Sequence, residues 1–199
     1  MEIWTRIQSL HRWEKYTQVK RILKVATDYG FDDNLWHNYL TFFLMMSENP
    51  FSMTCEKVGA SDGSVNELVE NDFRIFKELF DYDFGPIEKD LGINCFSQIS
   101  NYKAIHKKDL MYNKNVSEKV RSLSKKLEAA KDEKEFFDAV TGFYKDYGVG
   151  MFGLNKAFRI DDTPQGSFTF RAINNMDTVM LDDLVGYEIQ KKKLVDNTE

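Results

Sequence analysis

Cysteine, proline and histidine are scarce in this chain of 199 residues, which contains two, three and three of them respectively. The cysteines Cys55 and Cys95 are far apart, the histidines are dispersed, and no Cys-x-x-Cys or His-Glu-x-x-His pattern occurs. Zinc therefore has no local pair of ligands. The low cysteine content and an N-terminus that begins polar, without a secretory leader, predict a protein of the reducing cytoplasm.

A surplus of positive charge and a long apolar run are also missing. The 27 Lys and Arg residues are outnumbered by 32 Asp and Glu residues, which gives a net charge of −5 and argues against a nucleic-acid partner, because phosphates attract basic surfaces. The longest apolar candidate, residues 40–46, is about a third of the roughly 20 residues that a membrane span needs. With 42% hydrophobic and 14% aromatic residues, the chain is globular, and we expect no membrane association.

Hydrophobic periodicity predicts a series of helices through the first three quarters of the chain. We expect helices over residues 13–28, from an N-cap at Asp33 to Asn49-Pro50, from a capping box at Ser64 and Glu67 to about residue 80, from Pro86 to Gly92, and over part of 96–112. The glycine-containing stretch 55–63 has no period and is predicted to be a loop.

The clearest helical pattern comes next. Apolar residues recur every three or four positions in a seam: Val116, Val120, Leu123, Leu127 and Ala130. Asp132 is expected to cap the following helix, which Gly148 ends. Two heptads are too few for a coiled coil, so we expect helix-on-helix packing.

The period then changes to alternation at 158–160 and 168–173, which predicts a small hairpin, and a last helix is expected over about 187–197. The fold class is therefore mainly α, with a β-hairpin near the C-terminus. We expect a helical domain over residues 1–160 and a second, incomplete part over 161–199, with 161–166 as the linker.

The segment between the helices and the hairpin contains two glycine patterns. Gly148, Gly150 and Gly153 spell G-x-G-x-x-G, but a predicted helix precedes them where a dinucleotide site needs a strand, so we interpret them as a helix cap and a turn. The run 150–157 misses the P-loop pattern, because Asn155-Lys156-Ala157 stands where Gly-Lys-Ser/Thr is required. Lys156 and Arg159 remain as an anion-contacting pair or, as we expect more readily, a solvated or partner-facing pair.

Catalytic groups are isolated. Cys55 has no base partner in the sequence, and the carboxylate pairs Asp161-Asp162 and Asp182-Asp183 suit a turn and a helix start. The run 191–193 of lysines is interpreted as a solvated helix face. An enzyme that uses Cys55 or an Asp pair is kept as one alternative, to be judged by whether the fold gathers them with a histidine.

One segment resembles a known family. Residues 180–194 begin Met-Leu-Asp-Asp-Leu-Val-Gly and continue into a helix with Glu, Gln and Lys, and this is similar to the opening box of AAA+ ATPase modules. The run 147–159 and the aromatic helices before it resemble the N-terminal region of an uncharacterised bacterial branch of AAA+ ATP-binding proteins.

The resemblance implies that Leu184, Val185 and Gly186 form part of an adenine pocket. Physically, glycine lets the backbone approach a flat ring and valine offers an apolar face. No residue here matches a phosphate loop or a magnesium ligand, so the chain itself is not expected to be an ATPase. The resemblance implies ATP and magnesium only for an intact protein that continues beyond Glu199. It also allows that intact protein to be a homo-oligomer.

In AAA+ proteins such leading domains commonly recruit substrates or adaptors, so the resemblance implies that residues 1–160 bind a protein partner. Five residues are candidates for docking to that partner or to the absent ATPase core: Met151, Phe152, Lys156, Phe158 and Arg159. The other alternative is a free-standing helical interaction module without any link to nucleotides.

Overall fold

The structure is a computed structural model that describes residues 12–60, 64–104, 112–162, 166–174 and 181–197. Its helices precede and follow one hairpin: α2 (Arg12–Tyr29), α3 (Leu35–Met46), α4 (Pro50–Val58), α5 (Ser64–Phe80), α6 (Gly85–Leu91), α7 (Cys95–Ser100), α8 (Lys114–Ala129), α9 (Glu133–Tyr147), α10 (Gly150–Leu154), β1 (Phe158–Asp162), β2 (Phe168–Ala172), the 3-10 turn η1 (Leu181–Asp183) and α11 (Glu188–Asp196). The mainly helical fold class with a C-terminal hairpin is confirmed.

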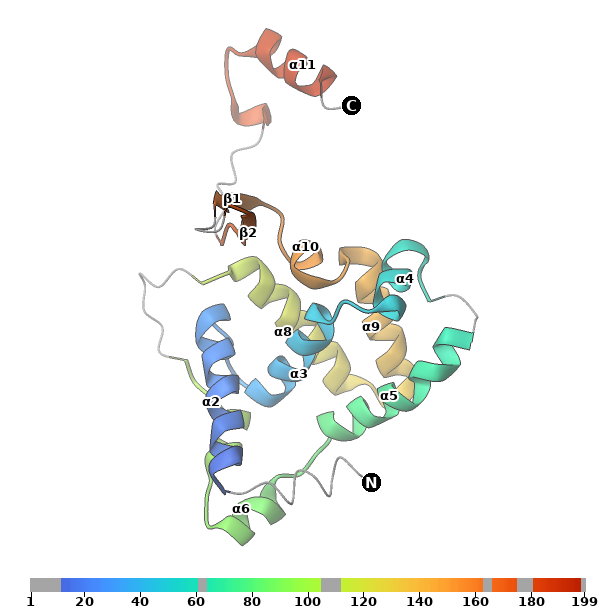
Figure 1. The fold of residues 1–199 in the computed structure, drawn as a ribbon, viewed down its shortest axis with the longest axis vertical. Coiled ribbons are helices and arrows are strands. Elements are labelled where there is room, and N and C mark those ends of the chain that lie inside the picture. Colours follow the sequence, from blue (N-terminus) through green and yellow to red (C-terminus); the bar gives the residue numbers. More distant parts are fainter. Residues whose placement is uncertain (1–11, 61–63, 105–111, 163–165, 175–180, 198–199) are drawn as a thin grey trace.

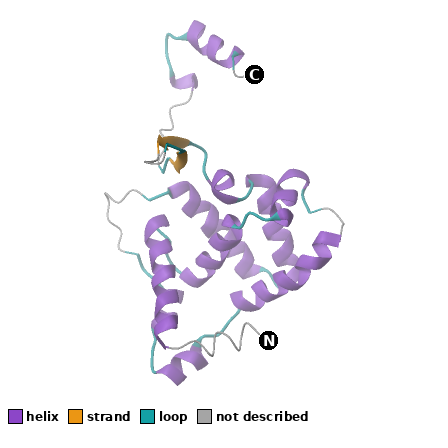
Figure 2. Cartoon of the chain, viewed as in Figure 1, coloured by secondary structure: helices purple, strands orange, loops and turns teal. Residues whose placement is uncertain are grey.

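The helices α2 to α10 form one body, and the hairpin and α11 extend from it on one side (Figures 1 and 2). Helix α3 lies at the centre of the body and contacts α2, α7 and α8, while α9 packs against α4, α5 and α8. The core follows these contacts, and its fully buried large side chains include Phe31, Leu35, Phe80 and Phe136. No described helix is long and apolar enough to cross a membrane.

Helix α8 has the seam that its sequence predicts. Val116, Val120, Leu123, Leu127 and Ala130 are all buried, with exposed fractions between 0% and 7%. They face α3 and α9, which pack against α8 from two sides. These apolar side chains are therefore used in packing between helices.

The cap predicted for α9 is also confirmed. The Asp132 carboxylate accepts from the Glu135 N–H at 2.8 Å, and Gly148 follows the helix with φ +80°. Glu135 in turn accepts from the Lys131 N–H, one residue before the cap. Both ends of α9 are thus fixed by local hydrogen bonds.

The predicted N-cap at Asp33 is wrong by one residue. Asn34 caps α3, because its side-chain oxygen accepts from the His37 N–H at 3.1 Å. Asp33 has φ +64° and instead exchanges two backbone hydrogen bonds with Tyr102, which ties this turn to the end of α7. Asp33 and Asn34 both prefer cap and turn positions, and the backbone pairing of Asp33 with Tyr102 leaves Asn34 as the cap.

The loop predicted over 55–63 is wrong over its first half. Asn49 and Ser52 form a capping box, so Pro50 begins α4 at the first helical position, where its missing N–H costs nothing. The helix buries Phe51 and Cys55 against α5 and α9 and ends at Gly59. The Asn-Pro pair, interpreted as the end of one helix, is the start of another.

The remaining helix predictions agree with the structure where it describes them. Helix α2 covers the expected 13–28, α6 contains Pro86 and ends at Gly92, and α7 lies at the start of the expected 96–112 helix. His11, His106 and the side chains of the Ser64–Glu67 capping box lie outside what the structure describes.

The hairpin pairs β1 with β2 in antiparallel register, with Phe158 opposite Ala172 and Asp162 opposite Phe168. Asp161 and Asp162, expected at the start of a linker, belong to β1, so this strand crosses the expected division at residue 160. Residues 181–197 form η1 and α11, close to the predicted last helix.

Candidate functional site

The three glycines of the G-x-G-x-x-G pattern make a tight connection between α9 and α10. Gly148 and Gly150 have φ of +80° and +68°, which residues with a side chain rarely adopt. A Cβ on Gly153 would lie 2.4 Å from the carbonyl carbon of Gly148. A helix precedes the glycines, so the interpretation as a cap and a turn agrees with the structure.

Two carboxylates occupy the surroundings of this turn. Glu56 Oε2 accepts from the Val149 N–H at 3.2 Å, and a Cβ on Gly150 would lie 1.8 Å from Glu48 Oε1. Negative groups at these positions repel a phosphate, since like charges at short range oppose each other. Glu56 therefore holds the glycine turn, and both carboxylates oppose a bound phosphate there.

Lys119 of α8 fixes the other end of α10. Its ammonium donates to the carbonyls of Gly153 and Leu154 at 3.0 and 3.2 Å and lies 5.0 Å from the ring centre of Tyr147. Burial, with a smaller contribution from Lys156, lowers the pKa of Lys119. This lysine binds the exposed carbonyls at a helix C-terminus, a structural role.

Beyond α10, four side chains form a cluster that we call the phenylalanine patch: Phe152, Phe158, Phe168 and Phe170. Phe152 of α10 lies 4.9 Å from Phe158 of β1 and 5.5 Å from Phe170 of β2, measured between ring centres. Phe168 lies 5.7 Å from Phe170 in an edge-to-face arrangement. Such pairs are favourable beyond their buried area, so the patch holds the hairpin against α10.

Most of the patch faces solvent. Phe152 is 57% exposed and Phe168 is 65% exposed, and Ile160 on the same sheet face is 63% exposed. The opposite face of the hairpin is polar and contains the Arg171–Asp161 ion pair at 2.8 Å. The hairpin thus has one charged face and one exposed aromatic face, and an exposed apolar patch of this kind is typical of a protein-binding surface.

Next to the patch is a pocket of about 520 Å³ between the hairpin and the helical body, which we call the junction pocket. Its lining comes from α2, α3, α8, α10 and the end of β2: Thr27, Asp28, Tyr29, Met46, Asn113, Val116, Met151, Leu154, Asn155, Ala172 and Asn174. Asn113 donates to Asn155, which in turn donates to the Met151 carbonyl. The pocket combines adaptable methionines with amides, a lining that suits a peptide.

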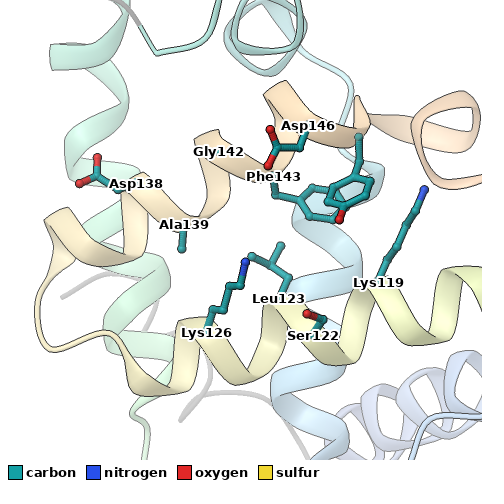
Figure 3. A pocket seen from close by; sticks show the side chains of 10 residues that line it. Lys119, Ser122, Leu123, Lys126, Asp138, Ala139, Gly142, Phe143 and Asp146 are labelled. Carbon is teal, nitrogen blue, oxygen red and sulfur yellow. The ribbon is translucent and has the colours of Figure 1, made fainter.

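A smaller groove of about 180 Å³ lies between α8 and α9 (Figure 3). Lys126 and Asp138 lie toward one end, Lys119 toward the other, and Gly142 faces it without any atom within 4 Å of its Cβ position. Its lining has no histidine or cysteine beside Ser122, so the groove lacks the pair of nucleophile and base that covalent catalysis needs.

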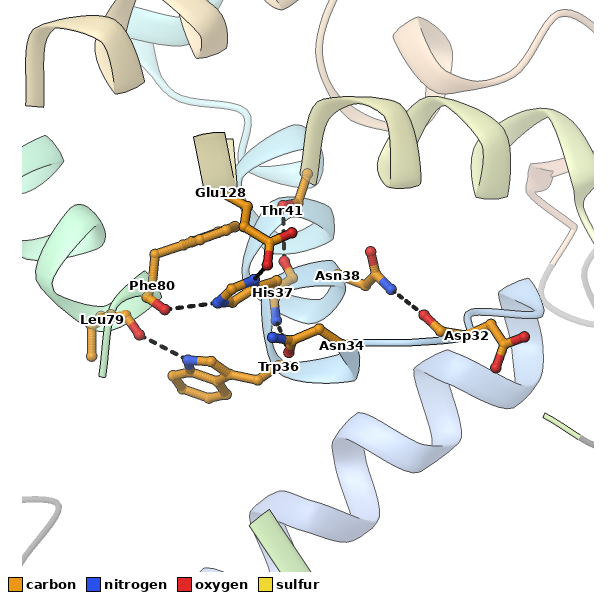
Figure 4. Close-up of polar contacts among 9 residues, drawn as sticks. All are labelled: Asp32, Asn34, Trp36, His37, Asn38, Thr41, Leu79, Phe80 and Glu128. Carbon is orange, nitrogen blue, oxygen red and sulfur yellow. Dashed lines mark hydrogen bonds and ion pairs between the residues drawn. The ribbon is translucent and has the colours of Figure 1, made fainter. Parts of the chain in front are cut away.

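A polar cluster surrounds His37 at the start of α3 (Figure 4). The His37 Nε2 lies 2.7 Å from the Phe80 carbonyl, and its Nδ1 lies 3.9 Å from a Glu128 oxygen without a hydrogen-bond partner. Trp36 donates to the Leu79 carbonyl at 2.8 Å. Burial lowers the pKa of His37. The cluster joins α3 to the end of α5, with His37 hydrogen-bonded to the Phe80 backbone carbonyl.

The candidate nucleophile and carboxylates are not gathered. Cys55 is 1% exposed within α4, where burial raises the pKa of its thiol, which is the wrong direction for a nucleophile. Asp161 is ion-paired on the hairpin, and Asp182-Asp183 lie in η1. In the described ranges no group of three or more His, Cys, Asp or Glu residues is arranged to hold a metal.

The C-terminal box lies outside the helical body (Figure 1). Val185 is 88% exposed, Leu184 is 41% exposed and Gly186 has φ +86°. Neither η1 nor α11 has a buried residue, and Ile189 and Leu194 of α11 are 72% and 57% exposed. In α11, Lys191 pairs with Glu188 at 3.1 Å.

The structure brings together some of the five predicted docking residues. Phe152 and Phe158 belong to the patch, Met151 lines the junction pocket, and Lys156 and Arg159 are exposed beside them. Phe168 and Phe170 complete the patch and were not among the candidates. Their period-2 spacing in the expected strand was the available signal, because it places both on one face.

Comparisons with known proteins give no relative: no family model, no curated protein and no solved structure matches this chain.

Proposed function

We propose that this chain is the helical leading domain of an AAA+-type ATPase, joined to the first turn and helix of the nucleotide-binding module, and that it docks a protein partner. One observation carries the proposal. Residues 181–197 contain no fully buried residue, and their apolar residues Val185, Ile189 and Leu194 are between 57% and 88% exposed. A segment with this composition needs further protein to pack on.

The same segment is the one that resembles the AAA+ opening box. Val185 in this turn is 88% exposed, and Gly186 adopts φ +86°, a conformation that residues with a side chain rarely adopt. A backbone without a Cβ beside an apolar valine suits the flat face of an adenine ring. The exposed Val185-Gly186 turn therefore supports the proposal that this segment forms one part of a nucleotide pocket.

The docking role is supported by the phenylalanine patch. Phe152 and Phe168 are more than half exposed, and the aromatic rings are held in place by α10 and the hairpin pairing. Aromatic side chains on a rigid element are typical anchors of protein interfaces. The hairpin, which contributes three of the four rings, lies between the helical body and the C-terminal box, where a bound partner would reach both (Figure 1).

The test of the nucleotide link is a titration with a fluorescent ATP analogue, performed on the chain extended beyond Glu199 through a phosphate loop. We expect Val185→Asp to weaken binding at least tenfold, because a carboxylate would meet the adenine ring. Val58→Asp, at a position 64% exposed on the body, is the matched control and should leave the affinity unchanged.

A gene that ends at residue 199, or equal affinities for both variants, would contradict the nucleotide link and favour a free-standing interaction module. The docking role has a separate test: Met151→Ser combined with Phe152→Ser should reduce the ATPase rate or the assembly of the extended protein. Unchanged rate and assembly would show that this segment docks nothing.

A further inference from the structure

The two strands of the hairpin each have an outer edge. The Ile173 N–H donates to the Ala157 carbonyl at 2.9 Å, which makes these two residues a hydrogen-bonded pair of the antiparallel ladder. Such pairs alternate with pairs whose N–H and C=O groups point away from the partner strand. By the register, Phe158 and Ala172 are the next pair, so their backbone groups point outward.

The same alternation continues along β2. Phe168, Phe170 and Ala172 direct their N–H and C=O groups away from β1, and in the described part of the chain no residue bonds to these outward groups. The side chains of these three residues lie on the aromatic face of the sheet. The free edge of β2 therefore runs along the phenylalanine patch, with a row of hydrogen-bonding groups beside an apolar surface.

The edge of β2 leads into the junction pocket. Ala172 lines this pocket together with Asn174 just beyond the strand, whereas no residue of β1 does. The interior is apolar at Met46, Met151 and Leu154, and the Asp28 carboxylate at the lining is ion-paired with Lys24 at 2.8 Å. A chain that follows β2 would thus reach a cavity able to take an apolar side chain.

We propose that an extended polypeptide binds by adding a third, antiparallel strand along β2, with an apolar side chain at every second position. These side chains cover the phenylalanine patch, and one of them enters the junction pocket. The inference rests on the docking role proposed above and names the class of partner. Main-chain hydrogen bonds supply affinity and alternate side chains supply specificity, as in other strand additions. A two-stranded hairpin is marginal alone, and a third strand stabilises it.

The probe is a fluorescent decapeptide with leucine at every second position, serine between, and lysine at both ends to keep the peptide in solution. The two residues of a hydrogen-bonded antiparallel pair exchange two hydrogen bonds and place their side chains on the same face of the sheet. Leucines that oppose Phe168, Phe170 and Ala172 therefore supply the N–H groups that bond to β2. N-methylation of the leucines should weaken binding at least tenfold, and N-methylation of the serines should not.

Two chain variants give the reciprocal test. Ala172→Pro removes an outward N–H from β2, while Asp162→Pro removes one from β1, and neither breaks a hydrogen bond between the strands. We expect at least tenfold weaker peptide binding for Ala172→Pro and unchanged binding for Asp162→Pro. The comparison of N-methylated peptides uses the unchanged protein, so it tests the strand addition even where a variant disturbs the hairpin.

Absence of binding, or equal effects of the two methylation patterns, would overturn the strand addition. These results leave the docking role separately testable, because Phe168→Ser in the extended protein would still lower assembly if side chains alone form the interface. A loss with Phe168→Ser and no effect of N-methylation identifies docking without a third strand. No effect of either change contradicts both proposals.

Discussion

The helical body buries its apolar residues, whereas the C-terminal segment 181–197 exposes similar ones to solvent. In the body, Val120 and Leu127 of α8 are fully buried, whereas Val185 and Ile189 in the segment are 88% and 72% exposed. The body's seam packs between α3 and α9, whereas neither η1 nor α11 contains a buried residue. The body thus buries its apolar residues within itself and the segment leaves them exposed, which is why we propose that the segment packs on further protein.

The largest effect should come from the core of the body. Phe136 is fully buried and lies 5.4 Å from the Phe80 ring, so Phe136→Ala should lower the free energy of unfolding by about 3–5 kcal/mol, as cavity-forming phenylalanine deletions do. Phe168→Ala, at a position 65% exposed, should change it by no more than about 0.5 kcal/mol. Urea unfolding measures both, and equal losses would erase the contrast between the two regions.

The body could be predicted largely from its sequence because its signals are local. The seam of α8 and the caps of α9 depend on spacing and on side chains three residues apart, and both were correct. The start of α4 was missed because Asn49-Pro50 satisfies both a helix end and a helix start. The choice is made by Ser52, which completes the capping box, and by burial of Cys55 against neighbouring helices.

A smaller effect is expected where the body joins the hairpin. Gly150→Ala forces a side chain into φ +68° and against Glu48, so it should destabilise by about 1–2 kcal/mol. Gly142→Ala in the middle of α9 is the matched control: nothing lies within 4 Å of the added Cβ, and helix propensity favours alanine by about 1 kcal/mol. Thermal unfolding should therefore show shifts of opposite sign, and shifts of the same sign would refute the role of the turn.

A pH-dependent contribution is expected from His37 in the body. Burial holds its pKa below the ordinary value of 6.5, against the raising effects of the Phe80 carbonyl, Glu128 and Asp81. The unfolded chain therefore takes up a proton first, and the free energy of unfolding should fall as the pH drops below about 6.5.

Lys77 also faces this histidine and opposes its protonation. His37→Gln keeps a donor for the Phe80 carbonyl and removes the titration, so its unfolding free energy should depend less on pH between 7 and 5. Urea unfolding at several pH values checks this expectation. Equal pH profiles for the two proteins would mean that other groups dominate.

The candidate docking surface was only half predictable from sequence. Phe152 and Phe158 were candidates because they belong to the aromatic, glycine-flanked segment 151–158, and the structure places them together. Phe168 and Phe170 join them through the pairing register, which local spacing does not specify. The junction pocket draws on residues as distant in sequence as Thr27 and Asn174, so only the tertiary fold reveals it.

The smallest effect is expected for removal of the C-terminal segment. A chain that ends at Asn174 should unfold at the same urea concentration as the 199-residue chain, because residues 181–197 contain no fully buried residue. A substantially lower midpoint would show that the segment stabilises the body, and the contrast between a packed body and an exposed segment would then be wrong.

Amide hydrogen exchange tests the central claim most directly, since it reports the stability of each element separately. The account predicts slow exchange in α8 and α9 and rapid exchange in α11 for the 199-residue chain. It also predicts that α11 becomes protected in the chain extended through the phosphate loop. Protection of α11 already equal to that of α8, or no gain in the extended chain, would contradict it.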